Sequence, residues 1–314
     1  MSKQSNNTLL VIGECMMELW EEGNTYHRAF AGDTYNSAVY AKRFQPDIDV
    51  QIMTTIGDDS ISKAMVAQWE KDHVGYSLVT TSLKAHPGIY AITTDDDGER
   101  SFTYWREGSA ATELMTLLTS EAKTKITRFD VIFFSGISLA ILSDKDKSAL
   151  LSLIEQAKAL GSTIAFDPNY RAVLWDSPEQ AKHWLTKAYQ LSDIALPGLS
   201  DHKEIFGHEN NNDVMDWLEY LGVGEIVVKA ESEGIYGYTR AERLVHVPIT
   251  PENNPIDTTG AGDSFAGTYL AARLKGATMR NALQSAAKVA GFVVLHRGAI
   301  VDEYLYNNFL SRES

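Results

Sequence analysis

The sequence predicts an α/β fold in which helices cover both faces of a mostly parallel sheet. Short apolar runs alternate with longer helical patterns along the chain, and within each run the apolar residues are continuous. Strands that are buried on both faces have this continuous pattern, whereas strands with one wet face alternate. The 314 residues, 44% of them apolar and 22% charged, can bury a large core, and we expect one domain over residues 1–314.

The strands of the sheet are predicted at 9–12, 131–134, 163–166 and 225–228. Helical patterns lie between them at 36–43, 60–71, 145–160, 179–190 and 214–221. Gly161 and Gly222 follow two of these patterns, at the position where a glycine commonly ends a helix. The β–α–β order predicts parallel pairing, because a crossover helix returns the chain to the same edge of the sheet.

Two segments break this rhythm. Residues 89–94 and 100–105 are typical of two strands joined by an Asp-Gly turn at Asp97 and Gly98, which is a strong hairpin signal. Residues 18–30 are predicted to add a second antiparallel piece beside this hairpin. Such a patch is either an edge hairpin of the main sheet or a lid over a site.

Charge and cysteine content exclude several classes of protein. The 28 Lys and Arg against 42 Asp and Glu give a net charge of −14, which argues against binding to nucleic acid or to an anionic membrane surface. The single cysteine, Cys15, cannot form an internal disulfide and suits a reducing compartment. No apolar run approaches the roughly 20 residues of a membrane helix. We therefore expect a cytoplasmic protein.

The glycine-rich run DTTGAGDSFAG at 257–267 leads into a stretch, 265–274, that predicts a buried helix. Glycines before a helix let backbone N–H groups approach an anion, and the helix N-terminus adds partial positive charge. The run is not a P-loop, which ends in Gly-Lys-Ser/Thr. A carboxylate such as Asp263 would repel phosphate unless it faces an acceptor hydroxyl instead. The alternative is that Asp263 only favours the helix dipole.

These residues resemble a known family. The run at 257–265 resembles the C-terminal signature of the ribokinase-like (PfkB-type) carbohydrate kinases, and AGDTYNSA at 31–38 resembles their early sugar-binding signature, with alanine at the first glycine. The resemblance covers residues 9–298 and implies a ribokinase-like three-layer α/β/α sandwich with a small β-sheet lid, here in residues 14–31 and 88–107. It also implies that Asp263 is the catalytic base. The amides of Gly260, Ala261, Gly262 and Asp263 would then form an anion hole for the transferring phosphoryl group.

The resemblance also implies cofactors. The family uses ATP and Mg²⁺, and its Asn-x-x-Glu metal pattern matches residues 201–204 with Asp201 in the Asn position. Glu204 is therefore expected near Mg²⁺, acting through water, although a solvated helix start explains the segment equally well. Asp257 is expected beside a monovalent cation such as K⁺. The nucleotide-binding residues implied by the resemblance are Asn169, Lys229, Glu231, Gly234, Gly260 and Gly262.

Within the family, the segments 32–36, 102–110 and 167–171 resemble the kinases of 2-keto-3-deoxygluconate. Period two places Phe102, Tyr104 and Arg106 on one face of a strand, and Arg171 follows a strand at the carboxyl edge, where open α/β sheets bind ligands. A sugar acid needs such guanidinium groups and a neutral sugar does not. The resemblance implies a sugar-acid site of Gly32, Asp33, Thr34, Tyr35, Asn36, Tyr90, Tyr104, Arg106 and Arg171.

The expected activity is ATP-dependent phosphorylation of the 6-hydroxyl of 2-keto-3-deoxy-D-gluconate. One alternative is a kinase of the same family for a neutral sugar such as fructose or ribose. A second is a non-catalytic protein that binds a sugar acid or nucleotide. A nicotinamide-dependent oxidoreductase is disfavoured, because only Gly13 follows the first strand where a glycine fingerprint would stand. Lid hairpins of the family can pair between subunits, so a homo-oligomer is a further expectation.

Overall fold

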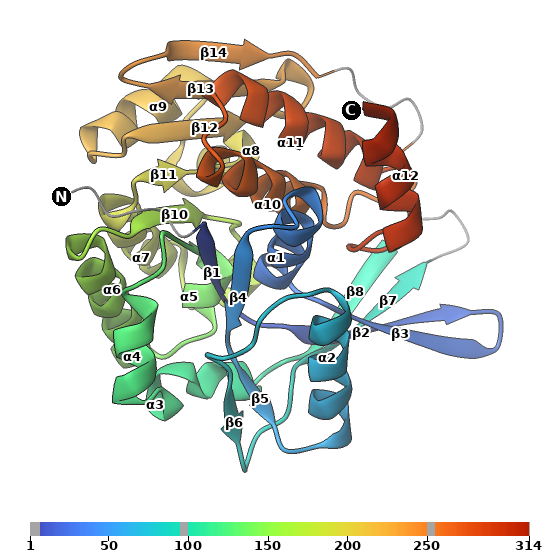
Figure 1. Cartoon of the computed structure of the whole chain (residues 1–314). Helices are drawn as coiled ribbons and strands as arrows, with labels where there is room; N and C mark the ends of the chain where they lie inside the picture. The colour runs from blue at the N-terminus through green and yellow to red at the C-terminus, as the bar shows by residue number, and fades with distance from the viewer. Residues whose placement is uncertain (1–6, 95–99, 250–254, 314) are drawn as a thin grey trace.

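The computed structural model describes residues 7–94, 100–249 and 255–313, and its main sheet runs in the order β14-β13-β12-β11-β10-β9-β1-β4 (Figure 1). The strands from β12 to β4 pair in parallel, and β13 and β14 add an antiparallel edge. The strands are β1 (Thr8–Ile12), β4 (Asp49–Met53), β9 (Val131–Ser135), β10 (Thr163–Asp167), β11 (Ile194–Ala195), β12 (Glu225–Lys229), β13 (Ile235–Thr239) and β14 (Arg243–Val247).

Two hydrophobic cores lie on opposite faces of this sheet. Along β1, Leu9 and Val11 pack into one core and Leu10 and Ile12 into the other, which explains why the apolar run is continuous. The first core is covered by α1 (Asp33–Phe44), α2 (Ser60–Lys71), α10 (Ala261–Leu274) and α11 (Met279–Val293). The second is covered by α3 (Leu114–Leu117), α4 (Ser120–Ile126), α5 (Gly136–Ala140), α6 (Asp144–Ala159), α7 (Pro178–Leu191), α8 (Leu199–Phe206) and α9 (Asn211–Tyr220).

The predicted elements of the sheet and its helices are confirmed, with differences at their ends. Helix α1 begins at Asp33, three residues before the predicted start, because Gly32 rather than a polar side chain caps it. Helix α12 (Glu303–Glu313) was not predicted, since polar and apolar residues are mixed along it. It packs through Tyr306 against Tyr40 of α1. A small parallel pair, β5 (Thr55–Gly57) and β6 (Thr80–Ser82), was also not predicted.

The lid is a separate sheet of β2 (Met16–Glu22), β3 (Thr25–Ala31), β7 (Ile89–Thr94) and β8 (Arg100–Trp105), in the order β3-β2-β7-β8. Each hairpin is antiparallel, and β2 and β7 join the two hairpins in parallel. The patch is therefore not an edge hairpin of the main sheet. The predicted turn at Asp97 and Gly98 lies outside the described residues.

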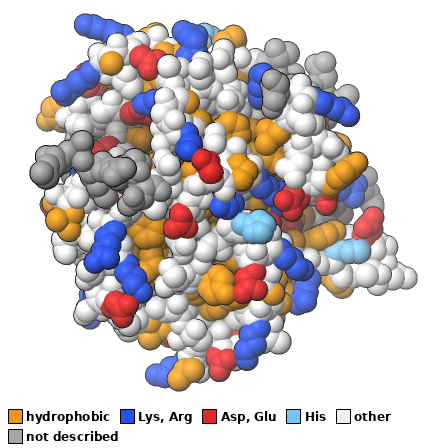
Figure 2. Space-filling view, viewed as in Figure 1, with side chains coloured by type: hydrophobic (Ala, Val, Ile, Leu, Met, Phe, Trp, Pro, Cys, Tyr) orange, Lys and Arg blue, Asp and Glu red, His pale blue; other side chains and the backbone are white. Residues whose placement is uncertain are grey.

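Acidic and basic side chains are intermixed over the face shown in Figure 2, with apolar side chains between them. Within the described ranges, no helix is long and apolar enough to cross a membrane.

Helices α1 and α10 pack together unusually closely at Gly267. A Cβ atom at this position would lie 2.1 Å from the carbonyl oxygen of Ser37. The Ser37 hydroxyl also donates a hydrogen bond to the main-chain oxygen of Asp263, at 3.0 Å. The glycine therefore sets how closely the first turn of α10 approaches α1.

Gly267→Ala should destabilise the protein by about 1–3 kcal/mol, because the two helices must separate to admit a methyl group. Gly291→Ala is the matched control within a helix, since no atom lies within 4 Å of its Cβ position. We expect the control to be neutral or to stabilise by up to about 1 kcal/mol. Urea unfolding measures both free energies, and equal values for the two variants would contradict this account of the packing.

Candidate active site

A cleft of about 820 Å³ lies where the lid meets the carboxyl edge of the main sheet. The lid contributes Tyr90, Phe102 and Tyr104 to its lining, with Arg106 just beyond β8. The main body contributes residues from the start of α1, the loop after β10 and the glycine-rich start of α10, together with Ile137 of α5. The structure thus brings together most residues of the three segments that the sequence singled out.

The glycine-rich run folds into a tight turn that caps α10. Gly260 has a left-handed backbone with φ of 77°, and a Cβ there would lie 2.5 Å from the Ala299 carbonyl oxygen, so only glycine fits without strain. Asp257 stabilises this turn through its carboxylate. Its carboxylate accepts hydrogen bonds from the amides of Thr259, at 3.0 Å, and Gly298, at 2.6 Å.

The first amides of α10 are available to an anion to different extents. The first turn of a helix leaves N–H groups without partners inside the helix. Gly260, Gly262 and Asp263 line the cleft. Ala261 does not line it, and its N–H donates a weak turn hydrogen bond to Thr258, at 3.3 Å. The predicted contribution of Ala261 to an anion hole is therefore not supported by its position.

The Asp263 carboxylate is held at the junction of α1 and α10. It accepts a hydrogen bond from the Asn36 side-chain amide at 2.8 Å. Burial raises the pKa of Asp263 to about 7, and the nearby negative charges of Asp33 and Asp167 act in the same direction. The Asn36 hydrogen bond and the positive charge of Lys229 oppose the shift of this pKa. The carboxyl group is thus poised to take up a proton near neutral pH.

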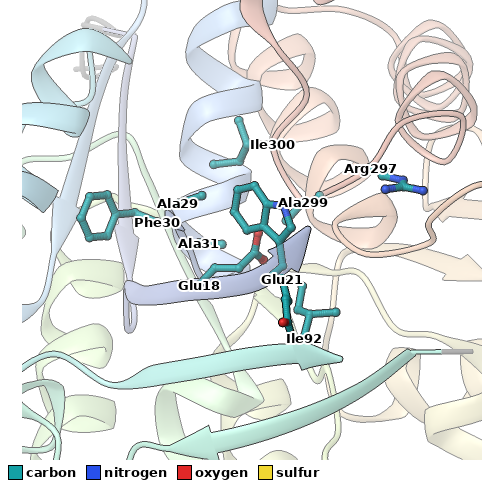
Figure 3. A pocket seen from close by; sticks show the side chains of 11 residues that line it. Glu18, Glu21, Ala29, Phe30, Ala31, Ile92, Arg297, Ala299 and Ile300 are labelled. Atoms are coloured by element: carbon teal, nitrogen blue, oxygen red, sulfur yellow. The ribbon is translucent and has the colours of Figure 1, made fainter. Parts of the chain in front are cut away.

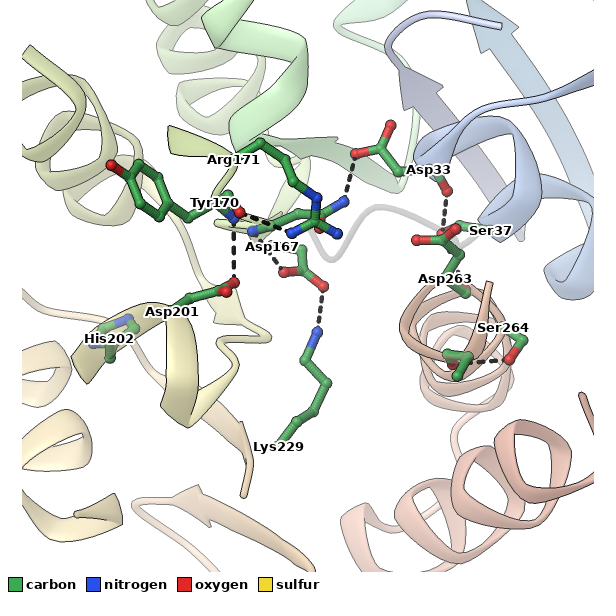
Figure 4. A network of polar contacts seen from close by, with 12 residues as sticks. Asp33, Ser37, Asp167, Tyr170, Arg171, Asp201, His202, Lys229, Asp263 and Ser264 are labelled. Carbon is green, nitrogen blue, oxygen red and sulfur yellow. Dashed lines mark hydrogen bonds and ion pairs between the residues drawn. The ribbon is translucent and has the colours of Figure 1, made fainter. Parts of the chain in front are cut away.

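A polar network crosses the floor of the cleft (Figure 4). The Asn169 side-chain amide donates to Asp33 at 3.0 Å, and its main-chain N–H donates to Asp167 at 3.1 Å. The Lys229 ammonium lies 2.5 Å from the other oxygen of Asp167. A Cβ at Gly262 would lie 4.0 Å from the same ammonium, so Lys229 stands beside the first turn of α10. The cation is close to the predicted anion hole.

Two arginines line the cleft, and they differ in burial and in hydrogen-bond partners. Arg106 is mostly buried and forms an ion pair with Glu14 at 2.5 Å, with its guanidinium 5.9 Å from the centre of the Tyr104 ring. Arg171 is exposed and donates only to the neighbouring Tyr170 carbonyl, at 2.7 Å, among the contacts described. Arg171 is therefore the more accessible positive charge for an anionic ligand.

The structure does not bring Thr34 and Tyr35 to the cleft, which corrects the expectation that all of 32–36 bind substrate. Both side chains are fully buried. The Tyr35 hydroxyl donates to Asp72 at 2.6 Å on the side of α1 that faces α2. Positions 33 and 36 share the other side of α1, because three residues make almost one helical turn.

A second cavity of about 170 Å³ lies next to the cleft under the same face of the lid, between the lid strands and residues 297–300 (Figure 3). Glu18 is buried against it and accepts a hydrogen bond from the Tyr90 hydroxyl. Burial beside Glu18 raises the pKa of Tyr90. Because Glu18 uses the hydroxyl, Tyr90 offers its aromatic ring to the cleft.

The two carboxylates of the predicted metal pattern lie in different surroundings on α8. Glu204 is exposed and does not line the cleft, whereas Asp201 turns toward the network and accepts from the Tyr170 amide at 3.2 Å. Burial and the charge of Asp167 raise the pKa of Asp201. The described part of the chain holds no cluster of three or more metal-binding side chains. Two carboxylates nevertheless fit Mg²⁺, which takes oxygen ligands and keeps several waters or phosphate oxygens.

The predicted nucleotide residues are divided between the cleft and a loop outside it. Asn169 lines the cleft itself, while Glu231 and Gly234 belong to the loop between β12 and β13 and do not line it. The end of β14 holds that loop, because His246 makes a hydrogen bond with the Glu233 carbonyl at 2.8 Å. A groove of about 940 Å³ follows, lined by residues 247–249, α11 and Phe309 of α12.

Comparisons with known proteins agree with this geometry. Residues 6–304 match the family described as pfkB family carbohydrate kinase. The chain is 39% identical over 298 residues to the 2-dehydro-3-deoxygluconokinase of Escherichia coli K12, covering 93% of this chain and 96% of that protein. It is 37% identical over 304 residues to the 2-dehydro-3-deoxygluconokinase of Dickeya dadantii, with coverages of 95% and 97%.

Solved structures show the same fold. A putative ribokinase II from E. coli in complex with ATP and Mg²⁺ superposes with a TM-score of 0.84 at 22% identity, covering 98% of this chain and 99% of that chain. A fructokinase with bound ATP from Xylella fastidiosa gives a TM-score of 0.83 at 18% identity, with the same coverages. The predicted three-layer fold with a β lid is confirmed.

Asp263→Asn should stabilise the protein at alkaline pH and leave its stability unchanged in acid. Below about pH 4 the carboxyl is protonated in both folded and unfolded chains. Between that pH and a folded pKa of about 7, the unfolded chain releases the proton first, so the wild type loses stability as pH rises. Urea unfolding of both proteins from pH 4 to 9 measures the difference. A difference that does not grow with pH would contradict the raised pKa.

Proposed function

Because this chain belongs to the pfkB family of carbohydrate kinases, we propose that it transfers the γ-phosphoryl group of ATP to the 6-hydroxyl of 2-keto-3-deoxy-D-gluconate. The curated relatives that are 33–39% identical over nearly the whole chain carry the name 2-dehydro-3-deoxygluconokinase. One observation supports the proposal most strongly. A single cleft holds a carboxylate at a helix N-terminus and, elsewhere on its wall, two guanidinium groups.

Asp263 is proposed to act as the base. Its carboxylate accepts the proton of the acceptor hydroxyl as that oxygen bonds to phosphorus. Phosphoryl transfer has a loose transition state, so positioning and charge stabilisation matter more than base strength. A pKa of about 7 still matches the task, because general bases work best when their pKa is near the operating pH.

The phosphoryl group is proposed to lie against the start of α10. The amides at Gly262 and Asp263 point toward the developing charge on its oxygens, as donors of an anion hole do. The ammonium of Lys229 stands beside them and can exchange its Asp167 partner for a phosphate oxygen. The adenine ring of ATP is assigned to the groove along α11, which the loop of Glu231 and Gly234 approaches where Gly234 lies against Pro248.

The residues Asp167 and Asp201 are proposed to hold Mg²⁺, with Glu204 acting from one helical turn away through water. When bound, the metal supplies positive charge to the nucleotide phosphates. The oxygen donors of the buried Asp167 and the partly buried Asp201 are of the kind that Mg²⁺ prefers.

The sugar acid is proposed to lie between the lid and the start of α1. Arg106 and Arg171 bind its carboxylate, while Asp33 and Asn36 bind hydroxyl groups at the other end. The ring faces of Tyr90 and Tyr104 cover the carbon chain, where the 3-deoxy carbon has no polar group to satisfy. Gly32 has no side chain, so the main chains at Gly32 and Glu14 approach closely at the base of the lid.

Three expectations stay predictions. Asp257 is proposed to contribute to a site for K⁺ beside the turn whose Thr259 and Gly298 amides its carboxylate binds. Pairing of lids into a homo-oligomer and a cytoplasmic location are likewise proposed. They rest on the exposed rings of the lid, such as Trp105, and on the lone cysteine.

A panel of acceptors tests the proposed substrate. With Mg·ATP, release of ADP should be fastest with 2-keto-3-deoxygluconate and slow with fructose and ribose. Arg171→Ala should raise KM for the sugar acid about tenfold or more, because a charge-assisted contact is worth about 1.5–3 kcal/mol. KM for a neutral sugar should not change.

Arg240→Ala is the matched control for this test, since it removes an exposed arginine at the opposite edge of the sheet. It should leave every KM unchanged. Preferred turnover of fructose or ribose by the wild type would overturn the sugar-acid proposal and favour the neutral-sugar alternative. Binding without any turnover would favour a non-catalytic binder.

A further inference from the structure

Glu14 lies where the chain leaves β1 and enters the lid, and sequence patterns alone do not single it out. Its side chain is only 2% exposed. One carboxylate oxygen accepts from the Arg106 guanidinium at 2.5 Å, and the other accepts from the Ser109 hydroxyl at 2.6 Å. Glu14 also lines the cleft. A buried carboxylate with both oxygens paired thus stands directly behind a proposed substrate-binding arginine.

Two glycines make room for Glu14 at the base of the lid, Gly88 for its carboxylate and Gly32 for its main chain. A Cβ at Gly88 would lie 2.7 Å from a carboxylate oxygen of Glu14, and a Cβ at Gly32 would lie 2.1 Å from its main-chain oxygen. Gly88 before β7 and Arg106 after β8 therefore meet the Glu14 side chain, and Gly32 after β3 meets its main chain. The space around Glu14 is filled, which leaves its carboxylate little freedom to turn away from Arg106.

Glu14 binds one edge of the Arg106 guanidinium, and the other edge keeps N–H donors for a further partner. The Arg106 side chain is 12% exposed, and its Nε is buried without a hydrogen-bond partner among the described residues. A guanidinium offers five N–H donors in a fixed plane, and Glu14 engages it through Nη2. Donors therefore remain for a second planar anion on the cleft side. A carboxylate is such an anion, and guanidinium groups commonly bind it with two parallel hydrogen bonds.

We infer that Glu14 is a positioning residue that fixes the plane of the Arg106 guanidinium, so that its free donors meet the carboxylate of the sugar acid. This inference rests on the proposed function. Glu14 does not itself touch the substrate carboxylate, which it would repel. It acts by holding Arg106 in one orientation, with Ser109 holding Glu14 in turn. A buried pair of this kind contributes little net stability, which leaves orientation as its main effect.

A double-mutant cycle tests the inference, with the sugar-acid Kd measured by calorimetry and KM and kcat measured by ADP release. Glu14→Ala should weaken sugar-acid binding about tenfold, as Arg106→Ala should, because either change removes an oriented charge-assisted contact. The double variant should bind no more weakly than Arg106→Ala alone. The change should be in Kd and KM, with kcat much less affected.

Glu14→Gln keeps the shape and an acceptor oxygen, so it should restore most of the binding that Glu14→Ala loses. Three results would each overturn the positioning role. The first is a double variant whose Kd rises by the product of the two single increases. The others are an unchanged Kd in Glu14→Ala and a loss of binding in Glu14→Gln as large as in Glu14→Ala. If Glu14→Ala does not fold, the same cycle with Ser109→Ala and Arg106→Ala carries the test, and independent effects would overturn it.

Glu225→Gln is the matched control. Glu225 is also buried and paired with an arginine, Arg273, at 2.6 Å, but it lies at the opposite edge of the sheet. This variant should lose stability and keep the wild-type Kd, and a raised Kd would show that the assay reports folding and would overturn the inference. A wild type that neither binds nor phosphorylates sugar acids would overturn the proposed function instead. The two failures are therefore distinguishable.

Discussion

The close crossing of α1 and α10 is the constraint on which the cleft depends. Gly267 allows the two helices to approach until Ser37 binds the main chain of Asp263 and Asn36 binds its carboxylate. The hydrogen bond from Asn36 fixes where the carboxylate stands relative to the amides of its own helix. An acceptor hydroxyl beside that carboxylate is then also beside the proposed phosphoryl position. The packing of the two helices therefore also positions the groups that are proposed to carry out the chemistry.

The chain is acidic overall, yet its cleft is proposed to bind anionic substrates. The protein carries a net charge of −14, and Asp33, Asp167, Asp201 and Asp263 all gather at the carboxyl edge of the sheet. Both proposed substrates, ATP and the sugar acid, are nevertheless anions. The structure reconciles the two through a few placed cations, because Lys229 and Arg171 act at short range where a diffuse field is weak. Burial and the negative charges of Asp33 and Asp167 raise the pKa of Asp263.

The sequence was most informative where a pattern determines backbone geometry. Continuous apolar runs predicted the buried strands, and the glycine run predicted the buried helix that follows it. Side-chain direction was harder to predict. Tyr35 sits inside a resembling motif but faces Asp72, because the motif begins a helix and only one side of it reaches the cleft. Glu14 carried no signal, since its partners Arg106 and Ser109 are more than ninety residues away along the chain.

The pH dependence of kcat/KM for the sugar acid tests the central claim most directly. If Asp263 is the base, kcat/KM for the wild type should rise with pH through about 7 and then level off. Asn36→Ala removes a hydrogen bond that lowers the pKa of Asp263, so its rising limb should move to higher pH. A wild-type profile that is flat from about pH 5 to 9, or a limb that Asn36→Ala leaves in place, would contradict the account.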